Sequence, residues 1–279
     1  MKLSRQNFRA SRRRQSAFSL LEILVAVGLL LVIVVGLLAM FSQAQRALRA
    51  GLTQVDVLEA GRATMQLVRG ELFELYPTRI DSAVNFKAEP AGAPALVSST
   101  QYFPGGSRDN VLHDLTFITK QNDQWTAIAY RVANSGLGVG TLYRNIETTT
   151  FDSSDPTDDP IPVIREWTIE KTRIGEKDPG FPGGAGFHRV ADGIVHFRCL
   201  AYDANGVLYN TTNTLAGGFI FKSNALPAYV DLELGILEPK ALEQFRAKAD
   251  NLATATAYLS KHPDKVHLFK QRIPIRTVP

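Results

Sequence analysis

Glu22 is the one charged side chain in an apolar run that extends from Phe18 to Phe41. A carboxylate at membrane depth costs about 2.5 to 3.5 kcal/mol on the insertion scale, so such a residue usually has a function and a partner of opposite charge. A cut between Ala17 and Phe18 would create that partner. The new ammonium at Phe18 would lie four residues before Glu22, on the same face of a helix.

The residues around this position resemble the class III signal of type IV pilins and type II secretion pseudopilins. A leader with six cationic and no acidic residues is followed by a small residue and by Phe-Ser-Leu-Leu-Glu, which opens the apolar run. The resemblance implies that a prepilin peptidase removes residues 1–17 and methylates the new N-terminus. Ala17 would then precede the cut, Phe18 would be the methylated residue, and Glu22 would be the assembly glutamate. Ala17 stands where the family usually has Gly.

The apolar run also permits two other interpretations. A secretory signal peptide has an apolar core of about 7 to 15 residues and a small-x-small cleavage site, and Ser42-Gln43-Ala44 could serve as that site. The run from Ile23 to Phe41, however, holds 19 uncharged residues, which is enough to cross a bilayer. An ordinary signal anchor fits the length but gives no reason for Glu22. The cationic leader predicts a single pass in the inner membrane, with the N-terminus cytoplasmic and the head periplasmic.

Composition limits the class of protein. The chain of 279 residues can hold a membrane helix and one globular domain. Its net charge is +4, but six positive charges lie in the leader, so the part from Phe18 onward has a net charge of −2. This balance argues against a nucleic-acid partner. Cys199 is the only cysteine, which excludes an internal disulfide, and we expect a buried and inert thiol.

Helical periodicity continues beyond the apolar run. Between residues 42 and 77, apolar residues recur at spacings of three, four or seven among charged ones, which predicts an amphipathic helix. Pro77 is the expected stop, so the helix would end at Tyr76. The predicted divisions are a leader at 1–17, a transmembrane half of the helix at 18–41, an amphipathic half at 42–77 and a head at 78–279. We expect the amphipathic half to dock on the head.

The head is predicted to be rich in β-strands. Residues 88–108, rich in Pro, Gly, Ala and Ser, are expected to form a surface loop. A helix is expected at 239–259, with Pro239 in its first turn. Strand composition is found at 111–119, 125–132, 141–146, 163–171, 193–202, 218–222, 228–236 and 266–277, with a hairpin turn at 121–123 and Pro274 placing the last strand at a sheet edge. The predicted fold class is α+β, a long N-terminal helix packed on a β-rich, pilin-like head.

The strand motifs of the head resemble those of the J-type minor pseudopilin of type II secretion. The similarity lies in Ile128 to Val132 followed by Leu142 to Arg144, in Asp192 to Arg198 with Tyr202-Asp203, in Leu226 to Leu232, and in the stalk segment Arg62 to Leu72. The helix at 239–259 departs from that pattern as an insertion before the last strand, and the body is longer than usual.

No motif places a nucleophile, a base and a stabilising group together, so the chain is not expected to be an enzyme. The glycine-rich segment 181–186 lacks the ending of a phosphate-binding loop, and the five histidines form no zinc-type pair. His196 is expected to be a structural histidine. The head also contains an acidic loop whose spacing does not match an EF-hand, so no cofactor is expected. Weak candidates for calcium in that loop are Asp152, Asp155, Asp158 and Asp159.

The signal and the strand motifs together predict a minor pseudopilin. It would be a structural subunit at or near the tip of a type II secretion pseudopilus, built into a filament with other pseudopilins by an inner-membrane assembly platform. A minor pilin of a type IV pilus or competence system is the alternative within the same class. A signal-anchored periplasmic binding module that does not polymerise is the alternative from another class, but it would not need Glu22.

Overall fold

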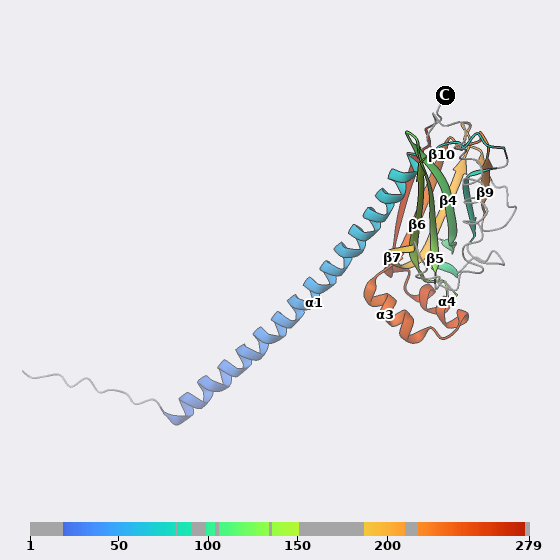
Figure 1. Ribbon diagram of the computed structural model, residues 1–279. Helices are drawn as coiled ribbons and strands as arrows, with labels where there is room; N and C mark the ends of the chain where they lie inside the picture. The colour runs from blue at the N-terminus through green and yellow to red at the C-terminus, as the bar shows by residue number, and fades with distance from the viewer. Residues whose placement is uncertain are drawn as a thin grey trace, which may run out of the picture. The chain divides into compact units, whose positions relative to one another are not determined.

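The computed structural model describes residues 19–81, 83–90, 99–103, 106–133, 136–150, 187–209 and 217–276 (Figure 1). The chain forms two compact units, Met1–Leu52 and Thr53–Pro279. The described part of the first unit is the beginning of helix α1, Leu20–Leu72. The second unit combines the last turns of α1 with a large antiparallel sheet and two short helices. The predicted α+β class is confirmed.

Helix α1 contains the one described stretch that is long and apolar enough to cross a membrane. Its most apolar window has a mean hydropathy of 3.2, and no residue of that window is buried. The long aliphatic side chains of this stretch leave nothing polar to interrupt the helix between Ile23 and Phe41. Length and composition therefore suit it to a bilayer of about 30 Å.

The end of α1 differs from the prediction. The helix stops at Leu72 rather than at Tyr76, so Pro77 does not terminate it. Leu75 forms a β-bridge with Thr119, and the Tyr76 N–H donates to the carbonyl of Ile118 at 3.1 Å. The N–H groups of Glu74 and Leu75 donate to carbonyls three residues back, so the helix tightens into a turn before the Tyr76 N–H joins the sheet.

The amphipathic half of α1 carries apolar residues on two faces, and one of these faces packs on the head. Val57, Met65, Val68 and Leu72 are buried in the main hydrophobic core, as expected for a docked helix. Leu48, Leu52, Val55 and Leu58 are exposed. We expected all the apolar residues of this half to dock on the head, but only one of the two apolar faces does.

The main sheet has nine strands in the order β11-β10-β7-β6-β5-β4-β1-β9, with β8 paired to β7, and all these pairs are antiparallel (Figure 1). A separate hairpin joins β2 and β3. The strands are β1 Val84–Pro90, β2 Ser99–Phe103, β3 Gly106–Asn110, β4 His113–Gln121, β5 Gln124–Ala133, β6 Gly140–Thr150, β7 Phe187–Tyr202, β8 Leu208–Tyr209, β9 Phe219–Lys222, β10 Tyr229–Leu237 and β11 Val266–Pro274.

Most strand predictions hold. Gln121 pairs with Gln124 across the predicted turn, where Asn122 adopts a positive φ of 53°, and β11 lies at the sheet edge as Pro274 suggested. The predicted loop at 88–108 is wrong, since this range contains the end of β1, all of β2 and the start of β3, which pairs with β2 in a hairpin. The range is rich in alanine, serine and glycine, which are uncommon in strands, so its composition favours a loop. The predicted strand at 163–171 lies outside the described residues.

The sheet is curled, and its concave side forms the core. Leu112, just before β4, forms a parallel bridge with Phe197 of β7, although β5 and β6 lie between these strands in the sheet. Tyr130, Phe86, Phe117 and Phe197 are among the largest fully buried side chains. Such aromatic contacts contribute beyond their buried area. The last turns of α1 pack into this same core.

The predicted helix at 239–259 is two helices, α3 Pro239–Lys248 and α4 Leu252–Lys261, which lie together at one end of the sheet (Figure 1). Asn251 interrupts the helix because its side chain accepts from the Thr254 N–H at 3.0 Å and caps α4. A 3₁₀ turn, Pro263–Lys265, then leads into β11. These helices form a second apolar core around Leu242, Phe245 and Leu259.

Replacing Gly61 by Ala is expected to weaken the docking of α1. A Cβ at Gly61 would overlap the Phe269 ring, whereas a Cβ at Gly70 would meet nothing within 4 Å. Overpacking costs about 1 to 3 kcal/mol, while Gly→Ala in a helix interior gains up to about 1 kcal/mol. Urea unfolding of the detergent-solubilised chain should therefore give a lower free energy of unfolding for Gly61→Ala than for the matched control Gly70→Ala. Equal values would show that Phe269 does not constrain the helix.

Candidate functional site

Glu22 lies in the first turn of α1, and the backbone around it is capped by Ser19. The Glu22 N–H donates to Ser19 Oγ at 3.2 Å and to the Ser19 carbonyl at 3.0 Å. The spacing Ser19-x-x-Glu22 is that of a capping box, a signal which the sequence reasoning missed. A negative charge in this turn also interacts favourably with the helix dipole. Glu22 therefore helps to define where the helix begins.

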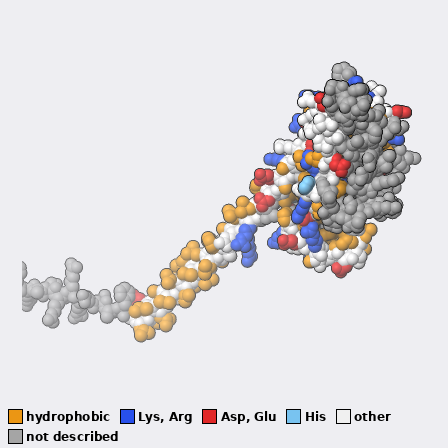
Figure 2. Space-filling view, in the orientation of Figure 1, with side chains coloured by type: hydrophobic (Ala, Val, Ile, Leu, Met, Phe, Trp, Pro, Cys, Tyr) orange, Lys and Arg blue, Asp and Glu red, His pale blue; other side chains and the backbone are white. Residues whose placement is uncertain are grey.

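The Glu22 carboxylate is exposed on an apolar helix surface. Residues around it along α1 are aliphatic, and Figure 2 shows hydrophobic side chains covering this part of the helix. No side chain of the described residues pairs with Glu22. Ala17 and Phe18, the predicted cleavage and methylation residues, lie outside the described residues. The arrangement leaves a carboxylate that a cationic group can reach from outside the helix.

A second glutamate of α1, Glu71, fastens the last turn of the helix to the sheet. Tyr130 Oη of β5 donates to one Glu71 oxygen, and Arg144 Nη2 of β6 donates to the other. The Glu71 side chain is 12% exposed and that of Arg144 is 24% exposed. Burial, together with the Glu71 charge, raises the pKa of Tyr130, so the phenol remains a proton donor. This contact joins three segments that the J-type resemblance singled out separately.

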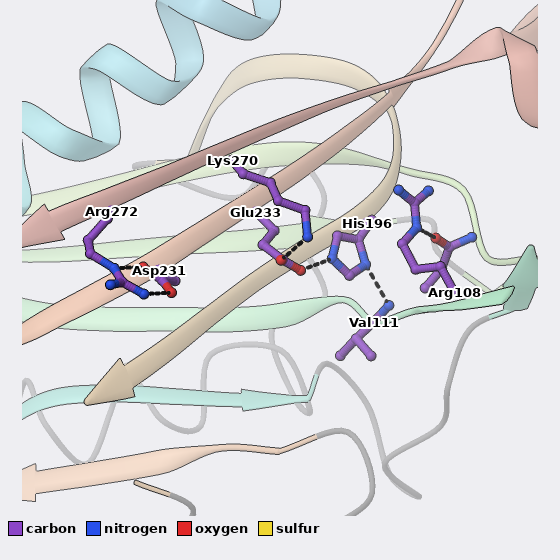
Figure 3. Close-up of polar contacts among 8 residues, drawn as sticks. Arg108, Val111, His196, Asp231, Glu233, Lys270 and Arg272 are labelled. Atoms are coloured by element: carbon purple, nitrogen blue, oxygen red, sulfur yellow. Dashed lines mark hydrogen bonds and ion pairs between the residues drawn. The ribbon is translucent and has the colours of Figure 1, made fainter. Parts of the chain in front are cut away.

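His196 belongs to a polar network on the other face of the sheet (Figure 3). The Val111 N–H donates to His196 Nδ1 at 3.0 Å, so the ring proton resides on Nε2, which donates to Glu233 at 3.0 Å. Lys270 Nζ donates to the other Glu233 oxygen at 2.6 Å. Both ring nitrogens are thus satisfied, and the predicted structural role is confirmed.

The charges of this network are set by burial and by neighbouring groups. The hydrogen bond from His196 outweighs burial and, with help from Lys270, lowers the pKa of Glu233 to about 2. Burial lowers the pKa of His196, which therefore stays neutral near pH 7. Cys199 is fully buried, and burial followed by the Asp231 charge raises the pKa of its thiol. The expected burial of Cys199 is confirmed.

The calcium candidates Asp152, Asp155, Asp158 and Asp159 lie outside the described residues. Within the described ranges, no three His, Cys, Asp or Glu side chains gather as they would around a metal ion.

The prokaryotic N-terminal methylation motif matches residues 12–38 of the chain. The match covers Ala17, Phe18, Glu22 and the start of α1, so the chain carries the N-terminal signal of type IV pilin-like proteins. A signal of this type implies processing by a prepilin peptidase and assembly with other pilins, and with the apolar helix it indicates membrane anchoring. No curated protein and no solved structure matches the chain.

Replacing Glu71 by Ala is expected to destabilise the head, because Tyr130 and Arg144 lose their common acceptor. Hydrogen bonds to charged groups contribute about 1.5 to 3 kcal/mol, and we expect a loss in that range from urea unfolding. Glu74→Ala is the matched control, since Glu74 is exposed and bonds only Gln121 at 2.6 Å. It should change the free energy of unfolding by less than about 0.5 kcal/mol. A Glu71 variant as stable as the Glu74 variant would contradict the role of this contact.

Replacing Glu233 by Gln is expected to lower stability at pH 7 and to have less effect in acid. The folded pKa of about 2 lies below the ordinary 4.5, so the stabilisation is complete above pH 4.5 and is lost as the pH falls toward 2. Urea unfolding at pH 7, 4 and 3 should show the difference from the parent chain shrinking. Glu243→Gln, on the exposed side of α3, should leave the profile unchanged. A pH-independent deficit in Glu233→Gln would exclude this linkage.

Proposed function

We propose that the chain is a J-like minor pseudopilin, a structural subunit of a type II secretion pseudopilus. The observation that carries the proposal is Glu22, placed in the first turn of an exposed apolar helix and inside the matched methylation motif. The β-rich head and its contact between Glu71, Tyr130 and Arg144 support the J-like subtype, because these residues lie in the resembling segments. The role is assembly rather than catalysis, and it requires no cofactor.

Assembly would be directed by charge neutralisation in the membrane. Removal of residues 1–17 frees the Phe18 ammonium, and Glu22 pairs with that ammonium on an adjacent subunit. A register that left either charge unpaired in lipid would cost several kcal/mol, which makes wrong registers rare. The head would lie in the periplasm, in keeping with the cationic leader.

The exposed stripe on α1 supports burial of the helix against other subunits. Leu48, Leu52 and Val55 have 67%, 57% and 57% of their surface exposed. They recur at i, i+4 and i+7, which places them on one side of the helix. A stripe of this kind is costly in water and is stabilised by packing against apolar helices.

Replacing Glu22 by Ala should leave the chain in the membrane but reduce its incorporation into filaments. Glu59→Ala is the matched control, because Glu59 is an exposed carboxylate of the same helix outside the apolar run. Sheared filaments and membranes are separated by sedimentation, and the chain is quantified in each. We expect at least a tenfold lower filament fraction for Glu22→Ala only. Normal incorporation of that variant would refute the pairing.

Mass spectrometry of the mature N-terminus distinguishes a filament subunit from a module that does not polymerise. A methylated Phe18 supports a filament subunit. An intact Met1, or a start at Gln45, would instead identify a signal-anchored or secreted module.

A further inference from the structure

A cavity of about 370 Å³ lies where the helical insertion meets the sheet. One wall comes from the β5–β6 connection and the start of β6, and the other comes from α3. The lining residues are Leu137, Val139, Gly140 and Thr141 on one side and Leu242, Phe245, Arg246 and Ala249 on the other. Four aliphatic or aromatic side chains of this lining belong to the second apolar core, which holds the walls in place.

A pair of guanidinium groups shares one carboxylate at the edge of this cavity. Asp192 of β7 accepts from Arg246 Nη2 at 2.9 and 3.1 Å and from Arg189 Nη2 at 2.9 Å. It also accepts from Thr141 Oγ1 at 2.7 Å and from the Gly193 N–H at 2.9 Å. Two guanidinium groups thus share one carboxylate, and Arg246 is the charged group that this network places in the lining of the cavity.

Arg246 is free to bind a further anion. Its side chain is 57% exposed, and only Nη2 is engaged, by Asp192. Its other nitrogens have no partner among the described residues. A guanidinium presents five donors in a planar fork that suits a carboxylate.

Burial of the Asp192 carboxyl would raise its pKa, but the hydrogen bonds from Thr141, Gly193 and Arg246 outweigh burial and lower it. Asp192 therefore stays charged and holds Arg246 in position at the mouth of the cavity.

We propose that this cavity binds the C-terminus of a partner polypeptide, with an apolar last side chain inside and the terminal carboxylate on Arg246. The apolar walls and the adjacent cationic rim together match a group that is apolar at one end and anionic at the other. An inorganic anion would leave the walls without a role. The volume lies near the lower limit of ligand sites, about 300 Å³, which suits one or two residues better than a long acyl chain.

This binding site is a separate function from membership of a filament. Half of its lining residues come from α3 and the residue that ends it. The resemblance to pseudopilins treats this helix as an insertion, and the cavity gives the insertion a use of its own. Binding to it requires neither cleavage of the leader nor assembly, so it can be measured on the dispersed chain.

The test uses the full chain in detergent micelles and a fluorescein-labelled hexapeptide that ends in Ala-Leu. Fluorescence anisotropy compares the free-carboxylate peptide with the same peptide amidated at its C-terminus. We expect the carboxylate form to bind at least tenfold more tightly. Arg246→Gln should abolish this preference, whereas Lys248→Gln, which removes the same charge from the exposed end of α3, should retain it.

A second variant guards against a folding effect of Arg246→Gln. Ala249→Met fills the cavity and leaves both guanidinium groups in place. It should abolish binding of the carboxylate peptide while the circular dichroism spectrum stays unchanged. Equal binding of the two peptides, full binding by Ala249→Met, or displacement of the peptide by dodecanoate at lower concentration than by unlabelled peptide would each overturn the proposal.

Discussion

The packing of the last turns of α1 against the concave side of the sheet is the interaction on which the second unit depends. Val57, Met65, Val68 and Leu72 enter the main core, and without them Phe86, Phe117 and Tyr130 would face water. Burial of this much apolar surface supplies the main favourable free energy of such a unit. The close approach at Gly61 and the contacts of Glu71 then fix how the helix lies on the sheet.

Two glutamates of the same helix illustrate how differently a carboxylate can be accommodated. Glu71 is largely buried and accepts from two donors of β5 and β6, so its charge is neutralised within the chain. Glu22 is exposed on an apolar surface, and its carboxylate accepts from no group of the described residues, since only its backbone N–H is engaged, as donor to Ser19. A membrane around it supplies no counter-charge, so neutralisation has to come from another molecule or from the processed terminus. The contrast explains why the proposed role of the chain is assembly.

The head uses its titratable groups for structure. His196 and Glu233 bond one another and the neighbouring strands, and Cys199 is enclosed by the core. Asp192 differs, because two guanidinium groups, those of Arg189 and Arg246, pair with its single carboxylate, and Arg246 lines a cavity. The structure thus separates a stabilising network from a surface suited to recognition.

The sequence by itself determined the local features. These features are the apolar run, the leader charge, Glu22 and the alternating strands, and each depends only on the order of neighbouring residues. The methylation motif and the antiparallel sheet agree with them. The cap at Ser19 and the break at Asn251 also have local sequence signals, because a capping side chain lies three residues before the N–H that it accepts from. The strands between 88 and 108 lack such a signal: β1 forms by pairing with β4 and with the distant β9, while β2 and β3 form a local hairpin without alternating apolar residues.

Only the tertiary structure decided which groups meet. The end of α1 at Leu72 depends on a bridge from Leu75 to a distant strand, and the two apolar faces of α1 differ only in what packs on them. The meeting of Glu71 with Tyr130 and Arg144, and of Arg246 with Asp192, joins residues more than fifty positions apart. Such contacts depend on strand order and sheet curl, which the balance of long-range packing sets and no local pattern encodes.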